Sequence, residues 1–248
     1  MTLFRSTLLA AAPLAAALLL PAGAAQAQDA KKAISFAGSA AFVSDYRFRG
    51  ISYSNHDPAV QAGLTMNTAP GFFVALWGSS IAEYAGSNTE VDIFGGWTGA
   101  LGPTTTTVGL YTYNYPGSSG TFVYELYGSV AMPMGPVTGT IGLNWAPGQD
   151  NLRSSSRYIY GTLSAAIPGT PISLSGTLGH ERGGLVADEL ETTTQKLDWQ
   201  IGASVTFAPV TLGIAYVGND LPRTTQIGGY RPNEMAKDGI VVSLSAAF

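Results

Sequence analysis

Charged side chains recur at alternate positions in a chain that has few of them. Only 11% of the 248 residues are charged. Yet the stretch VSDYRFRGIS at 43–52 places Asp45, Arg47 and Arg49 two positions apart. Acidic and basic groups on one strand face can select ions beside a water-filled passage, or they can pair as salt bridges that fill a narrow interior. Both kinds of chemistry require an element that puts these charges on one face.

Residues that could catalyse a reaction are scarce. The chain has no cysteine and only two histidines. His56 lies in the predicted loop SNHDP, and His180 ends a predicted strand in GHER with no serine two positions away. A serine on a neighbouring strand could reach His180, but we expect a satisfied or exposed histidine there. We therefore predict that the protein is not an enzyme.

Metal and cofactor sites are not indicated either. The chain lacks thiols, a spaced histidine pair and calcium-loop spacing, and we expect no cofactor. Four acids of one predicted outer loop could hold divalent ions that bridge lipopolysaccharide, although we favour a solvated acidic loop. These acids are Glu181, Asp188, Glu189 and Glu191.

The N-terminus resembles an export signal. Arg5 precedes an apolar run at 8–20, and Ala25-Gln26-Ala27 forms a cleavage site. The run of about 13 residues is short of the roughly 20 that a membrane-spanning helix needs, so we expect a signal peptide at 1–27. Its removal takes away Arg5 and no acid, which leaves 11 basic against 16 acidic residues. This acidic balance argues against a nucleic-acid partner.

Alternation of apolar and polar residues predicts β-strands through the rest of the chain. At 195–207 every second residue from Leu197 to Phe207 is apolar, and the residues between them are polar or small. The pattern leaves the faces of 72–81, 104–115 and 156–167 open. Together with 34–48 we count twelve strands, and the others lie at 60–66, 91–97, 122–132, 137–145, 172–178, 195–207, 210–216 and 240–248.

The connections between these strands are of two kinds. Tight Pro/Gly turns follow the even-numbered strands, whereas longer polar loops such as 146–156, 181–194 and 218–237 follow the odd-numbered ones. Strands of about 9–13 residues suit a tilted membrane crossing, whereas those of soluble sandwiches average about 5–6. We therefore predict an all-β fold over 28–248: a single transmembrane up-and-down antiparallel β-barrel of about 12 strands, with short periplasmic turns and longer extracellular loops.

Lipid then assigns the two strand faces. An arginine facing the bilayer midplane costs about 2–4 kcal/mol, so the odd-numbered face of 34–49 should point into the lumen and the even-numbered face, including Tyr46 and Phe48, toward lipid. We predict that eight charged residues line the lumen: Asp45, Arg47, Arg49, Glu90, Asp92, Glu125, Lys196 and Asp198. Glu181 shares their parity.

Aromatics near strand ends would form interfacial girdles, with Phe42, Tyr46, Phe48, Trp145 and Tyr216 on the loop side and Phe72, Phe207 and Phe248 on the turn side.

Several segments also carry a family resemblance. They are VSDYRFRGIS at 43–52, DPAVQAG at 57–63, EVDIFGGW at 90–97, YTYNYPG at 111–117, YELYGSV at 124–130 and LGIAYV at 212–217. With these segments the chain resembles the TorF-type family of outer-membrane porins over nearly its whole length after residue 27. The resemblance implies an outer-membrane barrel and brings no catalytic residues.

Together these features predict a porin-like channel for passive diffusion of small hydrophilic solutes or ions. The alternatives are a sealed barrel with a lipid-facing enzymatic or structural role, and a surface-binding barrel that acts through its loops. Expected partners are outer-membrane lipids and lipopolysaccharide, the solutes, and the barrel-assembly machinery. That machinery would act through the C-terminal strand, with Phe248 as its membrane-assembly signal.

Overall fold

The computed structural model of the chain describes residues 33–118, 122–150, 152, 154–189, 193–221 and 235–248. The expected signal peptide at 1–27, Glu191, and the side chains of Asp188 and Glu189 lie outside this description. Strands dominate the described residues, where the only helix is the short α1 (Gly184–Glu189). In this part of the chain, no helix combines the length and the apolar character needed to cross a membrane.

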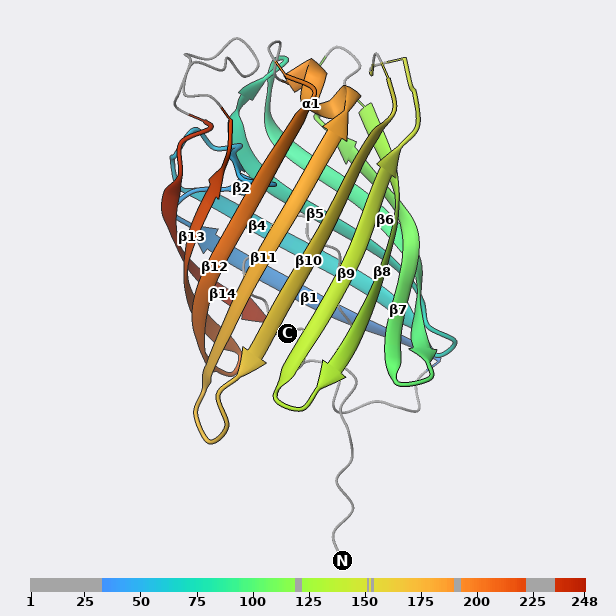
Figure 1. Ribbon diagram of the computed structural model, residues 1–248, viewed down its shortest axis with the longest axis vertical. Coiled ribbons are helices and arrows are strands. Elements are labelled where there is room, and N and C mark those ends of the chain that lie inside the picture. Colours follow the sequence, from blue (N-terminus) through green and yellow to red (C-terminus); the bar gives the residue numbers. More distant parts are fainter. Residues whose placement is uncertain (1–32, 119–121, 151, 153, 190–192, 222–234) are drawn as a thin grey trace, which may run out of the picture.

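Twelve antiparallel strands form one closed barrel, as the sequence predicts. Each strand pairs with its neighbour along the chain, and the first pairs with the last (Figure 1). The strands are tilted, and the loops gather at one end and the tight turns at the other. The barrel strands are β1 (Ile34–Val43), β4 (Ala59–Thr68), β5 (Phe72–Tyr84), β6 (Ser87–Leu101), β7 (Thr104–Asn114), β8 (Phe122–Met134), β9 (Val137–Ala146), β10 (Ser156–Ala166), β11 (Ile172–Gly183), β12 (Gln195–Phe207), β13 (Val210–Asn219) and β14 (Gly239–Ala247).

The alternation of side chains produces an apolar outer wall. On β12, Ile201 is 67% exposed on the outside, whereas its neighbour Gly202 is buried. The three strands whose faces the pattern left open follow the same rule. Val108 points outward on β7 while Tyr111 points inward, and Ile159 points outward on β10. Large apolar side chains thus cover the surface that a bilayer would contact.

The tight turns depend on glycine at particular positions. Gly71 joins β4 to β5 with φ of +94°, and a Cβ at this position would collide with the carbonyl oxygen of Thr98. Because glycine adopts positive φ without a steric cost, the turn can be this short. The Pro/Gly turns therefore set one end of the barrel, as expected.

The strand predicted at 34–48 is wrong beyond Val43. β1 ends there, and residues 44–57 turn into the barrel as a hairpin that contains β2 (Arg47–Phe48) and β3 (Ile51–Ser52). Tyr46 and Phe48, predicted to face lipid, are instead buried inside. The parity argument fails because it assumes that the strand stays in the barrel wall. We call residues 44–57 the luminal hairpin.

Aromatic packing holds the luminal hairpin against one wall of the barrel. The Tyr46 ring lies 5.5 Å from that of Trp77 on β5, and the Phe48 ring lies 5.6 Å from that of Tyr113 on β7. On its other side Ile51 packs with Val186 of α1 and with Leu221. The hairpin therefore spans the interior at the loop side of the barrel.

Candidate functional site

All eight predicted luminal residues lie inside the barrel, and each is buried. Glu181, whose parity also predicted an inward position, joins them and is not a loop residue available to outer ions. The hairpin carries three of these charges, namely Asp45, Arg47 and Arg49, and the barrel strands carry the rest. The structure thus buries these side chains within the barrel, and their role depends on how they pair.

The first cluster lies within the luminal hairpin and centres on Asp45. Its carboxylate accepts hydrogen bonds from Arg47 Nε at 2.6 Å and from Ser52 Oγ at 2.6 Å. His56 Nδ1 lies 3.1 Å from the same carboxylate. Arg47 Nη1 also donates to the carbonyl oxygen of Lys237 at 2.5 Å. This cluster fixes the fold of the hairpin and attaches it to the chain just before β14.

The second cluster joins the luminal hairpin to the barrel wall through Arg49. Arg49 Nη2 donates to Glu125 of β8 at 2.6 Å, and Arg49 Nη1 donates to Glu181 of β11. Since β9 and β10 separate these strands in the barrel order, one guanidinium connects two distant parts of the wall. Burial disfavours the charge on Arg49, but the carboxylates of Glu125 and Glu181 outweigh it and raise its pKa well above the usual value.

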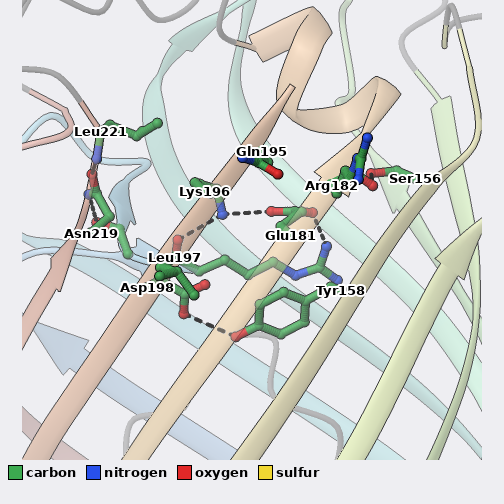
Figure 2. A network of polar contacts seen from close by, with 12 residues as sticks. Ser156, Tyr158, Glu181, Arg182, Gln195, Lys196, Leu197, Asp198, Asn219 and Leu221 are labelled. Atoms are coloured by element: carbon green, nitrogen blue, oxygen red, sulfur yellow. Dashed lines mark hydrogen bonds and ion pairs between the residues drawn. The ribbon is translucent and has the colours of Figure 1, made fainter. Parts of the chain in front are cut away.

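Lys196 and Asp198 extend this cluster along β12 (Figure 2). Lys196 Nζ donates to Glu181 Oε2 at 2.6 Å and to the carbonyl oxygen of Arg49 at 3.0 Å. Asp198 Oδ1 accepts a hydrogen bond from the hydroxyl of Tyr158 at 3.0 Å, and the Arg49 guanidinium lies 4.3 Å from the centre of the Tyr158 ring. Arg49 therefore lies between carboxylates and aromatic faces, whereas Lys196 lies between a carboxylate and a backbone carbonyl group.

A third group of acids lies on β6, where Glu90 and Asp92 point inward. Asp92 Oδ2 accepts a hydrogen bond from the hydroxyl of Tyr111 at 2.8 Å. The described buried charges do not balance, because six carboxyl groups accompany only three basic side chains. The acids are Asp45, Glu90, Asp92, Glu125, Glu181 and Asp198, and the bases are Arg47, Arg49 and Lys196.

The turn-side half of the lumen has a different character. Its inner faces carry pairs of hydroxyl groups on neighbouring strands: Thr98 with Thr107 at 3.0 Å, Thr162 with Thr177 at 2.9 Å, and Thr206 with Thr211 at 3.0 Å. Among the described residues, no charged side chain lies on this half of the inner wall. The lumen is thus neutral and hydroxyl-lined toward the turns, and charged and aromatic toward the loops.

Sequence reasoning missed the partners that complete the charged half. The hydroxyl groups of Tyr111, Tyr113 and Tyr158 hydrogen-bond to luminal carboxylates. The alternation of tyrosine on β7 and β10 is the sequence signal for these partners, but it does not show which face of either strand points into the lumen. In the described parts of the chain, no group of three or more His, Cys, Asp or Glu side chains is arranged to hold a metal ion.

Comparisons with solved structures place the fold among outer-membrane barrels. The KdgM porin aligns with a TM-score of 0.56 at 6% identity, over 86% of this chain and 98% of that one. The COG4313 outer membrane channel from Pseudomonas putida F1 gives 0.53 at 12% identity, over 86% and 94%. LpxR from Salmonella typhimurium gives 0.50 at 8% identity, over 86% and 99%. At such identities these likenesses establish the barrel fold alone.

Sequence comparison gives the family. No curated protein matches the chain significantly. A family model described as "Bacterial protein of unknown function (Gcw_chp)" matches residues 27–248. It does not carry the TorF-type name, so that finer resemblance stays a prediction. The chain therefore belongs to the Gcw_chp family of bacterial proteins.

Proposed function

We propose that the protein is an outer-membrane channel for passive diffusion of small hydrophilic solutes or ions, and that the luminal hairpin closes it in the conformation described above. Outer-membrane lipids and lipopolysaccharide would surround its apolar wall, and the barrel-assembly machinery would insert it. In this proposal the protein does not catalyse a reaction. His180 lies opposite Ile159 on one neighbouring strand and opposite Leu197 on the other. Neither of these side chains can act as a nucleophile.

The observation that carries the proposal is that the luminal hairpin, and not the barrel wall alone, blocks the lumen. The charged half of the lumen is filled by a short inserted segment and not by side chains of the barrel wall alone. Arg49 and Gly50 attach this segment to the wall by polar contacts, including a hydrogen bond from Asn219 Nδ2 to the carbonyl oxygen of Gly50 at 3.0 Å. Because such contacts can exchange for water, displacement of the hairpin would open a charged passage above a hydroxyl-lined one.

A permanently sealed barrel is the second candidate, and one observation favours it. The ion pairs of Arg49 and Lys196 are almost fully shielded from solvent, and breaking a buried pair costs about 3–5 kcal/mol. Such a cost would keep the hairpin in place on the timescale of transport. Measured conductance separates this candidate from the channel.

The test compares single-channel currents of the refolded protein and of an Arg47→Gln/Arg49→Gln variant in planar bilayers. We expect rare openings of the wild type. We expect longer openings of the variant with a preference for cations, since among the described residues Lys196 would then be the one buried base beside six buried acids. The control is Arg157→Gln/Arg182→Gln, which removes two exposed arginines. A folded barrel that conducts in neither form would leave the sealed barrel as the correct description.

A second variant moves the hairpin without changing any charge. Gly50 has φ of +85°, and a Cβ there would lie 2.8 Å from the carbonyl oxygen of Gly218 and 2.9 Å from Asp198 Cβ. Gly50→Ala should therefore push the hairpin off β12 and β13 and increase the open fraction. Gly102→Ala is matched to it, because Gly102 also has a positive φ but nothing within 4 Å of its Cβ position. Equal currents from both variants would contradict a hairpin plug.

A further inference from the structure

Two arginines lie side by side on the outer wall of the barrel, near its loop end. Arg157 on β10 is directly opposite Arg182 on β11, and both side chains are exposed. Their neighbours Tyr158 and Glu181 are buried and point inward, so Arg157 and Arg182 point outward. Among the described residues of the barrel strands, these two are the only arginines. The outer wall therefore concentrates its positive charge on one pair of strands.

This pairing of like charges costs stability unless an anion accompanies it. Residues directly opposite each other on antiparallel strands have Cβ atoms about 4.5–5.5 Å apart, and like charges at such positions are destabilising. Within the described ranges, neither guanidinium group forms an ion pair. Glu181 points inward and pairs with Arg49, whereas Asp220 accepts a hydrogen bond from the backbone N–H of Leu197 at 2.7 Å. The described part of the chain thus provides no counter-charge for the two arginines.

The strand register also gives the height of the two arginines on the wall. Trp145 of β9 lies opposite Arg157, and Gln195 of β12 lies opposite Arg182. Two positions nearer the tight turns, the outward side chains of the same four strands are mostly apolar. They are Leu143, Ile159, His180 and Leu197. A polar row with a tryptophan, directly above an apolar row, is typical of the level where lipid headgroups meet acyl chains.

We propose that Arg157 and Arg182 bind a phosphate group of lipopolysaccharide in the outer leaflet. A guanidinium group binds phosphate through two parallel N–H···O bonds. Two such groups match a phosphate monoester, which carries a charge of about −1.5 to −2 at pH 7. A lipid is the source of this phosphate because the apolar row beside the arginines would contact its acyl chains. The site rests on the outer-membrane placement of the proposed function, with the loops outside, and not on conduction.

Binding of lipid A, the phosphorylated anchor of lipopolysaccharide, tests the site by native mass spectrometry of the refolded barrel in detergent. We expect the wild type to bind bisphosphorylated lipid A at least about tenfold more tightly than dephosphorylated lipid A. Arg157→Gln/Arg182→Gln should lose this preference. Arg157→Lys/Arg182→Lys should keep part of it, because lysine retains the charge but not the bidentate geometry. Inorganic phosphate at the same concentration should not displace the lipid.

Lys237→Gln is the matched control for the single variant Arg182→Gln, since each removes one exposed positive charge on the loop side. It should bind both forms of lipid A like the wild type. The unfolding temperature gives a second readout. Bisphosphorylated lipid A should raise it for the wild type, whereas without lipid A the double glutamine variant should be at least as stable, because the like charges are gone. Heat-modifiable migration checks that each variant folds, and the single variants replace a double variant that does not.

Equal binding of bisphosphorylated lipid A by the wild type and the double glutamine variant would overturn the proposal. Equal affinity of the wild type for the two forms of lipid A would overturn it too, and would assign binding to the acyl chains. Both arginines face away from the lumen, so conductance in bilayers without lipopolysaccharide does not depend on this site. A barrel that prefers the phosphorylated form but never conducts would refute only the channel, and one that conducts without this preference would refute only the phosphate site.

Discussion

Single residues inside this barrel carry more than one structural contact. Lys196 joins Glu181 on the neighbouring strand and also holds the carbonyl oxygen of Arg49 on the luminal hairpin. Arg49 in turn connects β8 with β11. Because these groups are shielded from water, each loss leaves an unpaired charge in a buried place. The network is therefore sensitive to any one substitution.

Lys196→Met should reduce the free energy of unfolding by about 3–5 kcal/mol, since it leaves Glu181 with one cation in place of two. Urea unfolding of the refolded barrel, followed by tryptophan fluorescence, measures the loss. Lys237→Met is the control, because that side chain is exposed. A double-mutant cycle with Glu181→Gln gives the pair energy. A loss equal to that of the control would mean that water reaches the network.

At the scale of the element, β12 and the first segment show when strand parity can be trusted. β12 pairs with β11 and β13 along nearly its whole length, so its alternation is kept and Ile201 faces outward. After β1, Ser44 still pairs with Val242 of β14, but the chain then leaves the wall. The segment that follows has Gly50 at a positive φ and carries charges that find partners across the lumen.

The outward face of β12 can be tested directly. Ile201→Arg should lower the free energy of unfolding in a lipid bilayer by about 2–4 kcal/mol, as arginine does at mid-membrane positions facing lipid. Gln200→Arg at the adjacent inward position is the comparison and should cost less. Urea titrations of both variants in vesicles give the two values. A larger loss for Gln200→Arg would reverse the assignment of the faces.

At the scale of the whole molecule, the barrel depends on the seam between its first and last strands. β1 and β14 are paired over five residues of each strand, from Ser39 opposite Ala247 to Val43 opposite Ser243. Beyond β14, Phe248 continues the seam: its N–H donates to the carbonyl oxygen of Gly38 at 3.0 Å, and its own carbonyl oxygen accepts from Gly38 N at 2.6 Å. Its ring lies over Gly38 on the outer surface.

Phe248→Ala should reduce the yield of folded barrel in the membrane, because the side chain covers the closing seam and because we expect the assembly machinery to recognise this residue. Phe207→Ala is a matched control, since Phe207 is 68% exposed and Phe248 is 74% exposed, but Phe207 lies away from the seam. The fraction of heat-modifiable protein in membrane extracts measures the outcome. Equal yields would mean that Phe248 has no special part in assembly.

The sequence alone was sufficient for the wall of the barrel. Side chains alternate with a period of two, and turn residues such as Gly71 mark where the chain reverses, so that strand number, connection type and the direction of Asp92, Glu125 and Lys196 follow from local pattern. These features need no knowledge of distant residues. The cost of placing charge against lipid then selects the inner face.

Only the tertiary structure decided what the inner face does. Arg49 meets Glu125 across 76 positions of the chain and Glu181 across 132, and no local pattern specifies such partners. The same holds for the luminal hairpin, because Tyr46 and Phe48 alternate like lipid-facing residues and are placed inside by contacts with β5 and β7. Alternation determines which way a side chain points from a strand. Closure of the barrel and long-range pairing determine whether the segment stays in the wall and whether its charges face water or one another.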